Sequence, residues 1–231
     1  MRMTRPMSVR QIPAQVFEWL DSRIGLRELV TSSLHVLIPR GAHTYYLGGI
    51  TLFVFMSQAV TGILLSLYYE PTPDAAYNSI LYIMNQVNFG WLIRSVHAWG
   101  SNLMIIFCIL HMIRIIVQGA YKSPREITWM AGMGLLFVTL GFGFTGYLLP
   151  WDQRAYWATT VGTTIPEAIP VIGEWLRDFL RAGADISALT LSRFLGVHML
   201  ILPVSLVGLF ALHFLLIHRQ GLADPHEEEK R

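Results

Sequence analysis

The sequence predicts an all-α integral membrane protein, a bundle of four spanning helices preceded by an amphipathic helix on the membrane surface. Only 14% of the 231 residues are charged and 53% are hydrophobic, whereas a soluble domain carries about 25% charged residues. Residues 11–38 alternate apolar side chains with arginine and glutamate, which is typical of a helix lying on a membrane. Four later stretches are long and apolar enough to cross a hydrocarbon core of about 30 Å; they comprise residues 45–69, 91–117, 129–149 and 195–217.

Basic residues beside the spans predict the orientation. Arginines are frequent in the N-terminal segment, Lys122 and Arg125 lie between spans two and three, and the tail ends in a further basic pair. Because basic residues favour the cytoplasmic side, we expect both termini there, with spans two and four running in the same direction. The chain then divides into a surface segment (1–44), the bundle (45–217) and a tail (218–231). A net charge of +2 without a basic stripe argues against nucleic-acid binding.

The segment between spans three and four, residues 150–192, is too polar to cross a membrane. An unstructured loop of this length is uncommon in a compact protein, so we expect it to be ordered and functional, with a short amphipathic helix at 174–180. The one cysteine, Cys108, lies in an apolar stretch, which excludes a disulfide framework and a Cys-x-x-Cys-His haem attachment.

Four histidines form the main functional signal. His97 and His111 stand at positions i and i+14 of the second span, and His198 and His213 stand at i and i+15 of the fourth. Four helical turns take about 14.4 residues, so each span presents its histidines on nearly one face at two depths. Because these spans run in parallel, His97 can face His198 near the outer surface, and His111 can face His213 near the inner one. Facing imidazole pairs match the axial ligands of haem iron, whereas a closed zinc site takes four ligands at one level. The pattern therefore predicts two haems between helices two and four.

Glycines repeat the i, i+14 interval in the other two spans. Gly48 and Gly62 form one such pair in the first span, and Gly132 and Gly146 form another in the third. A planar macrocycle held between helices needs positions without a side chain. Beside the histidines we interpret the glycines as parts of two haem pockets, with ordinary close packing of membrane helices as the alternative.

Two arginines lie about one turn from a histidine in the second span. Arginine pairs well with carboxylates such as haem propionates, so we assign Arg94 to the outer haem and Arg114 to the inner one. Snorkelling to the interface is the alternative role. Pro203 lies between the histidines of the fourth span, and a kink there would explain why their interval is one position longer than that of the second span.

Four segments resemble the cytochrome b6 family, the counterpart of the N-terminal half of cytochrome b in quinol oxidoreductases. They are residues 88–97 (NFGWLIRSVH), 146–153 (GYLLPWDQ), 165–173 (IPEAIPVIG) and 213–217 (HFLLI). The resemblance covers nearly the whole chain. It implies a lower-potential b haem on His97 and His198 near the outer side, and a higher-potential b haem on His111 and His213 near the inner side.

The resemblance also implies the reaction. Quinol would be oxidised near the outer surface, beneath the 150–192 loop, where Pro150, Trp151 and Asp152 are the candidate site residues. One electron would pass to a Rieske iron–sulfur protein and on to a c-type cytochrome or a plastocyanin-like acceptor. The other would cross the membrane to reduce quinone, with proton translocation. The chain would be an electron-transfer subunit in an energy-transducing membrane, the bacterial plasma membrane by preference, in respiration or photosynthesis.

The implied complex has further subunits. The Pro-Glu-Trp-Tyr quinol-site motif of the family belongs to the C-terminal half of cytochrome b, and here Pro166-Glu167 is followed by alanine and isoleucine. The resemblance therefore implies a separate chain of the subunit IV type, besides the Rieske protein, membrane lipid and a homodimeric complex.

Three positions bear on the cofactors. In the b6 family a cysteine two residues before the first glycine attaches an extra c-type haem, and Tyr46 stands in its place here. A phenol forms no thioether, so we expect no covalent haem. Ala98 replaces an arginine that often follows the first ligand, which removes one propionate contact. His218 and Arg219 stand where the family has two basic residues, and Arg219 is a candidate contact for the inner haem or a quinone.

Two other classes of protein stay open. A dihaem membrane anchor of a quinone-linked dehydrogenase or hydrogenase also places histidine pairs in four helices, but it would not need the Pro-Trp loop or the paired glycines. A transporter would use intramembrane histidines for metal ions or protons, and it predicts acidic residues beside them. Between Glu70 and Asp152 the acidic residues are Asp74 and Glu126, both in predicted loops.

Overall fold

The computed structural model describes Phe17, Glu18, Asp21 and residues 46–221, and regular structure within these residues is exclusively helical. The chain forms two compact units. One comprises residues 41–216, and the other comprises residues 1–40 together with 217–231. The predicted surface helix at 11–38 lies outside the described residues, apart from three residues that are helical. The four spans lie in the first unit, except for the last residues of the fourth.

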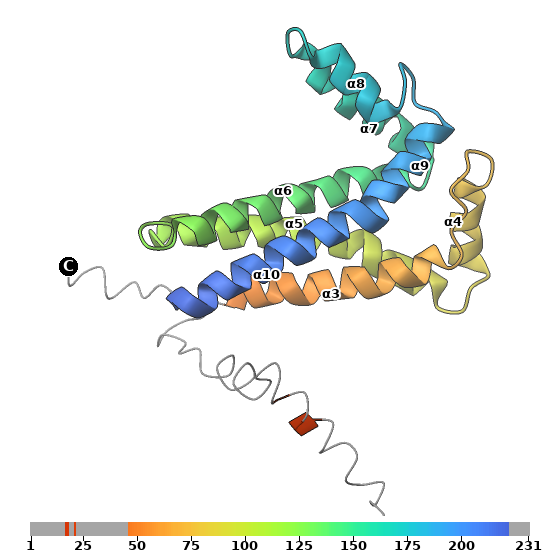
Figure 1. The fold of residues 1–231 in the computed structure, drawn as a ribbon. Coiled ribbons are helices and arrows are strands. Elements are labelled where there is room, and N and C mark those ends of the chain that lie inside the picture. Colours follow the sequence, from red (N-terminus) through yellow and green to blue (C-terminus); the bar gives the residue numbers. More distant parts are fainter. Residues whose placement is uncertain (1–16, 19–20, 22–45, 222–231) are drawn as a thin grey trace, which may run out of the picture. The chain divides into compact units, whose positions relative to one another are not determined.

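Within the part of the chain that the structure describes, four helices are long and apolar enough to cross a membrane. The first three are α3 (Tyr46–Ser66), α5 (Gly90–Val117) and α6 (Glu126–Leu148). The fourth is continuous from Ala188 to Gln220 and consists of α9 (Ala188–Gly196), the π-helix η3 (Val197–Ile201) and α10 (Leu202–Gln220). Figure 1 shows them side by side, with α3 and α6 running one way and α5 and α10 the other. The predicted four-helix fold, with parallel second and fourth spans, is confirmed.

The segments between the spans hold more helix than the sequence predicts. The first connection contains α4 (Ala76–Asn85), and the long loop contains α7 (Gln153–Thr164), the 3₁₀-helix η2 (Ile165–Ala168) and α8 (Gly173–Arg181). Much of this loop is therefore helical, and α8 has nearly the same bounds as the helix predicted at 174–180. The fourth span was predicted to begin at residue 195, which is too late, because α9 already begins at Ala188.

The start of α7 has a local cause. Asp152 has extended backbone geometry, and its carboxylate accepts a hydrogen bond from the Ala155 backbone N–H at 2.8 Å. An aspartate in this position satisfies one of the free N–H groups at a helix start. It thereby turns the chain sharply from the end of α6 into a helix.

The π-helix explains the longer histidine interval of the fourth span. The Leu202 N–H donates to the Val197 carbonyl, five positions back instead of the usual four. A π-turn inserts one extra residue into a helix, so an i, i+15 pair here spans as many turns as an i, i+14 pair in α5. The longer interval was predicted to come from a kink at Pro203, but the extra residue lies in the turn just before it. Pro203, which has no N–H to donate, directly follows this turn.

Close contacts position the spans. At Gly100 on α5 an added Cβ would lie 2.1 Å from Nε2 of Gln58 on α3, and this Nε2 donates to the Val96 carbonyl at 3.3 Å. At the loop-bearing end of the bundle, the Tyr69 hydroxyl donates to the Leu149 carbonyl at 2.6 Å. Beside it a buried apolar cluster joins α4, α6 and α9; its members are Ala76, Leu148, Leu191 and Phe194.

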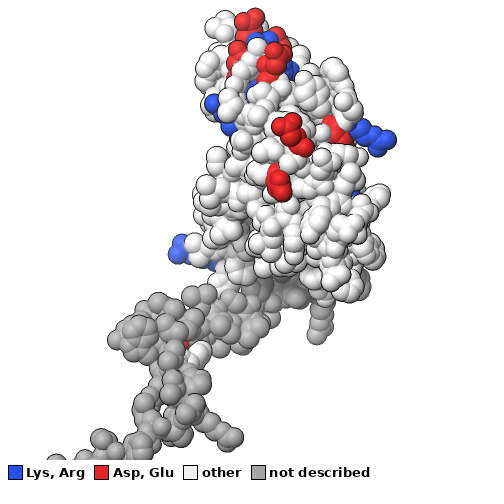
Figure 2. Space-filling view, turned by 90° about the vertical axis from the view of Figure 1, so that its right-hand side faces the viewer, with Lys and Arg blue, Asp and Glu red and all other residues white. Residues whose placement is uncertain are grey.

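The spans expose many large apolar side chains, as expected where lipid or other subunits cover them. Figure 2 views the bundle from the end that carries α4, α7 and α8. Charged side chains gather at the top of this face, over α8, which contributes Glu174, Arg177 and Asp178. We refer to this end as the outer end, following the predicted orientation.

Candidate functional site

His97 on α5 and His198 in η3 face one another across the bundle. Their ring centroids are 6.5 Å apart and their planes are inclined by 68°. Two imidazoles that bind one metal from opposite sides, through nitrogens at about 2.0 Å, have centroids roughly 6 Å apart. The gap therefore has the width that a metal with two axial histidines requires, and the sequence had paired these two residues.

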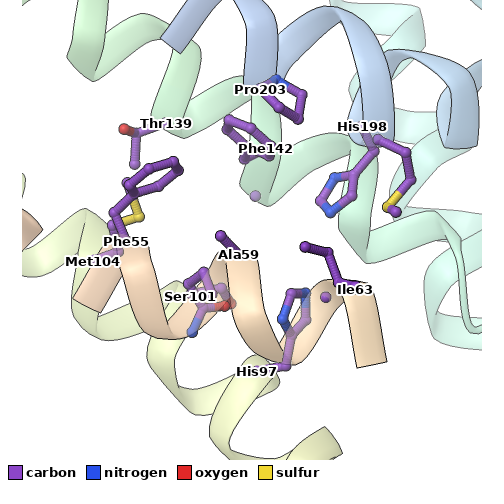
Figure 3. Close-up of a pocket in the computed structure, with 14 residues that line it drawn as sticks. Phe55, Ala59, Ile63, His97, Ser101, Met104, Thr139, Phe142, His198 and Pro203 are labelled. Atoms are coloured by element: carbon purple, nitrogen blue, oxygen red, sulfur yellow. The ribbon is translucent and has the colours of Figure 1, made fainter. Parts of the chain in front are cut away.

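Open space lies on both sides of this pair. A cavity of about 220 Å³ runs from the two histidines toward Phe55, Met104 and Pro203. Figure 3 shows both rings pointing into it, with Phe55 and Met104 at its far end. A second cavity, of about 400 Å³, is lined by the same two histidines and extends the other way to Arg94 and several polar residues. One end is thus apolar and the other carries positive charge.

Hydrogen bonds determine which ring nitrogens are free. Nδ1 of His97 lies 3.0 Å from the Thr61 hydroxyl, and this hydroxyl donates its proton to the Ser57 carbonyl at 2.7 Å. A hydroxyl has one proton, so Oγ1 accepts from Nδ1–H of His97. In a neutral ring Nε2 then has a free lone pair. The Nδ1 contact to a hydroxyl is also a typical orienting contact of metal-binding histidines.

His198 repeats this arrangement. Its Nδ1 lies 3.0 Å from the Thr145 hydroxyl, which donates to the Gly141 carbonyl at 2.8 Å. Nδ1–H of His198 is therefore a donor as well, and its Nε2 is free. Both outer histidines thus keep the nitrogen that a metal needs.

The second histidine pair lies toward the other end of the spans. His111 on α5 is close enough to His213 on α10 for their charges to interact, and Arg114 lies near it in the last turn of α5. Nδ1 of His213 lies 3.0 Å from the Thr128 carbonyl, which can only accept, so Nδ1 carries the proton and Nε2 is free. The structure thus brings together the second pair that the sequence predicts.

Each of the four glycines lies against the ring of one histidine. The glycines of α3 contact histidines of α5, and those of α6 contact histidines of the fourth span. An added Cβ would approach the histidine Cε1 to 3.3 Å (Gly48, His111), 3.2 Å (Gly62, His97), 3.3 Å (Gly132, His213) and 2.8 Å (Gly146, His198). The glycines therefore make room for the imidazole rings, a role that the sequence interpretation did not distinguish from making room for a macrocycle.

The other predicted residues lie as follows. Arg94 lines the larger outer cavity, and its Nη1 lies 3.9 Å from the Met84 sulfur. Pro150 and Asp152 line the same cavity. Trp151 has a left-handed backbone (φ 53°) and lines a separate surface pocket with Asp152. Arg219 lies in the last turn of α10, in the other unit, and its role stays a prediction.

Sequence reasoning missed several residues of the site. Thr61 and Thr145 are the partners of the outer histidines, and Arg154 of α7 lines the outer cavity together with Arg94. The signal for the threonines was present, since each directly precedes the outer glycine of an i, i+14 pair. No pattern pointed to Arg154, because the loop fold alone brings it to the cavity.

These features fit a haem. The two imidazoles of the outer pair offer axial nitrogens from opposite sides, and the flanking space extends beyond them as a planar macrocycle requires. The apolar end suits the ring edge, and Arg94 and Arg154 suit the carboxylates that haem carries as propionates.

Comparison with known proteins points the same way. The family model described as Cytochrome b/b6/petB matches residues 33–221. Cytochrome b6 of Mastigocladus laminosus is 43% identical over 213 residues, which are 92% of this chain and 99% of that protein. Cytochrome b6 of Prochlorococcus marinus (strain MIT 9515) is 41% identical over 213 residues, 92% of this chain and 98% of that protein.

A solved structure is also similar. A chain of a hyperthermophilic respiratory Complex III superposes with a TM-score of 0.81 at 33% identity, and the match covers 90% of this chain and 56% of that one. This chain thus spans about half the length of the Complex III chain, but nearly the full length of its cytochrome b6 relatives. With the family model matching most of its residues, and relatives above 40% identity along nearly their whole length, this chain belongs to the cytochrome b/b6 family.

Proposed function

We propose that the chain is the haem-carrying cytochrome b subunit of a membrane quinol oxidoreductase. In this role it carries electrons across the membrane, from an outer site of quinol oxidation to an inner site of quinone reduction, and so contributes to proton translocation. The observation that carries the proposal is the geometry of His97 and His198. Their rings are 6.5 Å apart, and both have Nδ1 engaged and Nε2 free.

Each histidine pair holds one b haem in this proposal. His97 and His198 would hold the haem at the outer site, and His111 and His213 would hold the haem at the inner site. A bound haem supplies a one-electron iron couple. Arg94 and Arg154 bind the propionates of the outer haem, and Arg114 binds one at the inner site. The four glycines hold the rings in place by allowing each neighbouring helix to approach closely.

The quinol-oxidation site lies at the outer end, beside the loop that begins at Pro150. Pro150 and Asp152 line the outer cavity, so quinol bound next to them would be close to the outer histidine pair. A partner chain of the subunit IV type completes this site, which accords with the match to about half of the Complex III chain. A Rieske protein and a c-type cytochrome or plastocyanin-like protein accept the other electron, and the complex is a homodimer.

The proposal includes no covalently attached haem. Tyr46 is the first residue of α3 and stands at the position of the family's cysteine. Its side chain is 57% exposed. A phenol offers no thiol for a thioether bond, so both haems are held without a covalent link to the polypeptide.

Location and domain organisation belong to the same proposal. The spans are embedded in an energy-transducing membrane, the plasma membrane of a bacterium, and both termini face the cytoplasm. Residues 45–217 form the dihaem bundle, residues 1–44 form a surface segment, and residues 218–231 form the tail, in which Arg219 contacts the inner haem or a quinone.

The test uses the complex purified with its partner chains. A pyridine haemochrome assay and a redox titration should give two b haems per chain with separate potentials, and a haem-stained denaturing gel should show none on this polypeptide. His198→Leu should remove the outer, lower-potential haem alone, and His213→Leu the inner one alone. Absence of haem from the wild-type complex would overturn the proposal. A haem band on the gel would contradict only the Tyr46 argument.

A further measurement separates the dihaem-anchor alternative. The complex should oxidise quinol and reduce a c-type cytochrome only when the Rieske protein is present. Two haems without any quinol-dependent cytochrome c reduction, in a preparation that contains a dehydrogenase subunit instead, would favour the anchor.

A further inference from the structure

Among the described residues, each outer histidine has a hydrogen-bond partner of a kind that the inner histidines lack. Each outer histidine contacts a threonine hydroxyl on the neighbouring helix, Thr61 for His97 and Thr145 for His198. Each threonine directly precedes the glycine that packs on the same ring. At the corresponding places before the inner glycines, the chain has Leu47 and Ala131, which have no hydroxyl.

Among the described residues, a backbone carbonyl lies beside both outer rings and beside that of His213, and the hydroxyl is an addition at the outer site. The His213 Nδ1 bonds to the Thr128 carbonyl, four positions before its glycine. The outer rings interact with carbonyls at the same offset, those of Gln58 and Phe142. Each outer Nδ1 therefore has a hydroxyl oxygen at hydrogen-bond distance in addition to a neighbouring backbone carbonyl, whereas among the described residues His213 contacts a carbonyl alone.

The direction of these bonds decides their chemical effect. The hydroxyl protons of Thr61 and Thr145 are donated to carbonyls of their own helices, at 2.7 and 2.8 Å, so both oxygens can only accept from the rings. An acceptor on Nδ1–H increases the electron density of the imidazole and makes Nε2 a stronger base. A more basic axial ligand favours ferric over ferrous iron and so lowers the reduction potential.

The surroundings strengthen the effect. Thr61 is 9% exposed and Thr145 is 7% exposed. Hydrogen bonds in such a low-dielectric environment are stronger than those in water. Two such bonds act on one iron from both sides, so their effects add.

We propose that Thr61 and Thr145 are positioning residues that lower the reduction potential of the outer haem relative to that of the inner haem. The inference rests on the proposed function, since it requires bound haem. It assigns the difference between the sites to two hydroxyl groups on α3 and α6. Thr61 and Thr145 thus make electron flow toward the inner side favourable.

Removal of the hydroxyls is the first test. In the purified complex, Thr61→Val and Thr145→Val should each raise the midpoint potential of the outer haem, and the double variant should raise it further. The potential of the inner haem should not change. Thr61→Ser and Thr145→Ser keep the hydroxyl and should restore the wild-type potential. Thr51→Val is the matched control, because among the described residues the Thr51 hydroxyl donates only to the Leu47 carbonyl of its own helix, at 2.9 Å.

Addition of a hydroxyl at the inner site is the converse test. Leu47→Thr places a threonine directly before Gly48, whose added Cβ would lie 3.7 Å from Nδ1 of His111. The substitution reduces side-chain volume, so it fits without overpacking. It should lower the potential of the inner haem and bring the two potentials closer.

The outcomes separate the inference from the proposed function. Electron paramagnetic resonance of the oxidised complex should show two low-spin bis-histidine haems in every variant, which excludes loss of a ligand as the cause of a shift. Valine variants that keep both haems with unchanged potentials would overturn the inference and leave the proposed function intact. If a valine variant loses the outer haem, the Leu47→Thr variant becomes the decisive test. An inner-haem potential that is unchanged in the Leu47→Thr variant would also overturn the inference. A wild-type complex without haem would overturn the proposed function itself.

Discussion

A methyl group on Gly146 would lie 2.8 Å from Cε1 of His198, the tightest of the four contacts between a glycine and a histidine ring. The ring must move for the methyl group to fit, and overpacking of this kind costs about 1–3 kcal/mol. We predict that Gly146→Ala displaces the His198 ring and weakens or abolishes binding of the outer haem, while the inner haem is retained. Haem content and redox titration of the purified complex measure both.

Two other glycines serve as comparisons. At Gly62 the added atom would lie 3.2 Å from the His97 ring, so Gly62→Ala should have a smaller effect on the same haem. At Gly208 on α10 no heavy atom lies within 4 Å of the added Cβ, and Gly208→Ala should leave both haems unchanged. Equal haem content and potentials in the Gly146 and Gly208 variants would contradict the prediction.

Arg154 should affect the outer haem in the opposite sense to the threonines. It lines the outer cavity, and its guanidinium forms no ion pair with any described residue. A cation near the propionates stabilises the reduced haem, so Arg154→Gln should lower the outer potential, by roughly 1 kcal/mol or about 40 mV for one electron. The shift should shrink at high salt. Arg177→Gln, on α8, is the control, and a potential that moves equally in both variants would refute a local role of Arg154.

Arg181 connects the loop helices without a carboxylate partner among the described residues. It is 7% exposed, and its guanidinium donates to the Thr163 and Thr164 hydroxyls at 2.7 Å, and to the Thr160 and Ala184 carbonyls at 2.9 Å. The C-terminal end of α7 thus provides the negative end of a helix dipole for this charge. Arg181→Met should leave these acceptors unsatisfied, and we expect a destabilisation of the order of 3 kcal/mol.

Limited proteolysis of the 150–192 loop measures this destabilisation. Cleavage should be much faster in the Arg181 variant. Arg177, one turn earlier on α8, forms surface ion pairs with Glu167 and Asp178, which typically contribute less than about 1 kcal/mol. Arg177→Ala should therefore be cleaved at close to the wild-type rate. Similar rates for the two variants would show that Arg181 does not hold the loop together.

Tyr69 should make stability sensitive to alkaline pH. Its hydroxyl donates to the Leu149 carbonyl, and burial raises the pKa of Tyr69 above its usual value. The folded state therefore holds the phenol proton of Tyr69 more tightly than the unfolded state does. The contribution of the protonated phenol to folding stability is complete below about pH 10 and declines as the pH rises above this value. Tyr69→Phe should lower the free energy of unfolding by about 1 kcal/mol at neutral pH. As the pH rises, the variant should lose less stability than the wild-type protein. Thermal unfolding monitored across this pH range tests both, and parallel curves would contradict the role of the phenol.

The spans and the histidine pairs follow from the sequence because both depend on regular periodicity. Apolar length marks a membrane helix, and intervals close to four whole helical turns place His97 opposite His198 once the spans run in parallel. Of the helices in the connections, α8 was predicted, whereas α4 and α7 were missed because their signals are weaker. The start of the fourth span was missed because Ser192 and Arg193 lie in it as it emerges from the polar loop, and hydropathy does not register them as helical.

Contacts that depend on side-chain direction were not predictable in the same way. The intervals indicate the depth of Gly62 and Gly146, but the packing decides that they meet imidazole rings. The hydroxyls of Thr61 and Thr145 gain their role only from the direction of hydrogen bonds within α3 and α6. Arg154 reaches the cavity from the first turn of α7, the helix that Asp152 starts.

The pairing of glycines and histidines also affects the biosynthesis of the bundle. Each glycine-bearing helix packs on the histidine helix that follows it in the chain, α3 on α5 and α6 on the fourth span, so the protein consists of two consecutive hairpins. Each hairpin supplies only one histidine of each pair. A nascent chain that ends before α9 has a complete first hairpin but no second ligand at either site. If each pair holds a haem as proposed, stable haem insertion would follow membrane integration of the fourth span, because both ligands of a site are present only then, and each haem would link two hairpins that are synthesised one after the other.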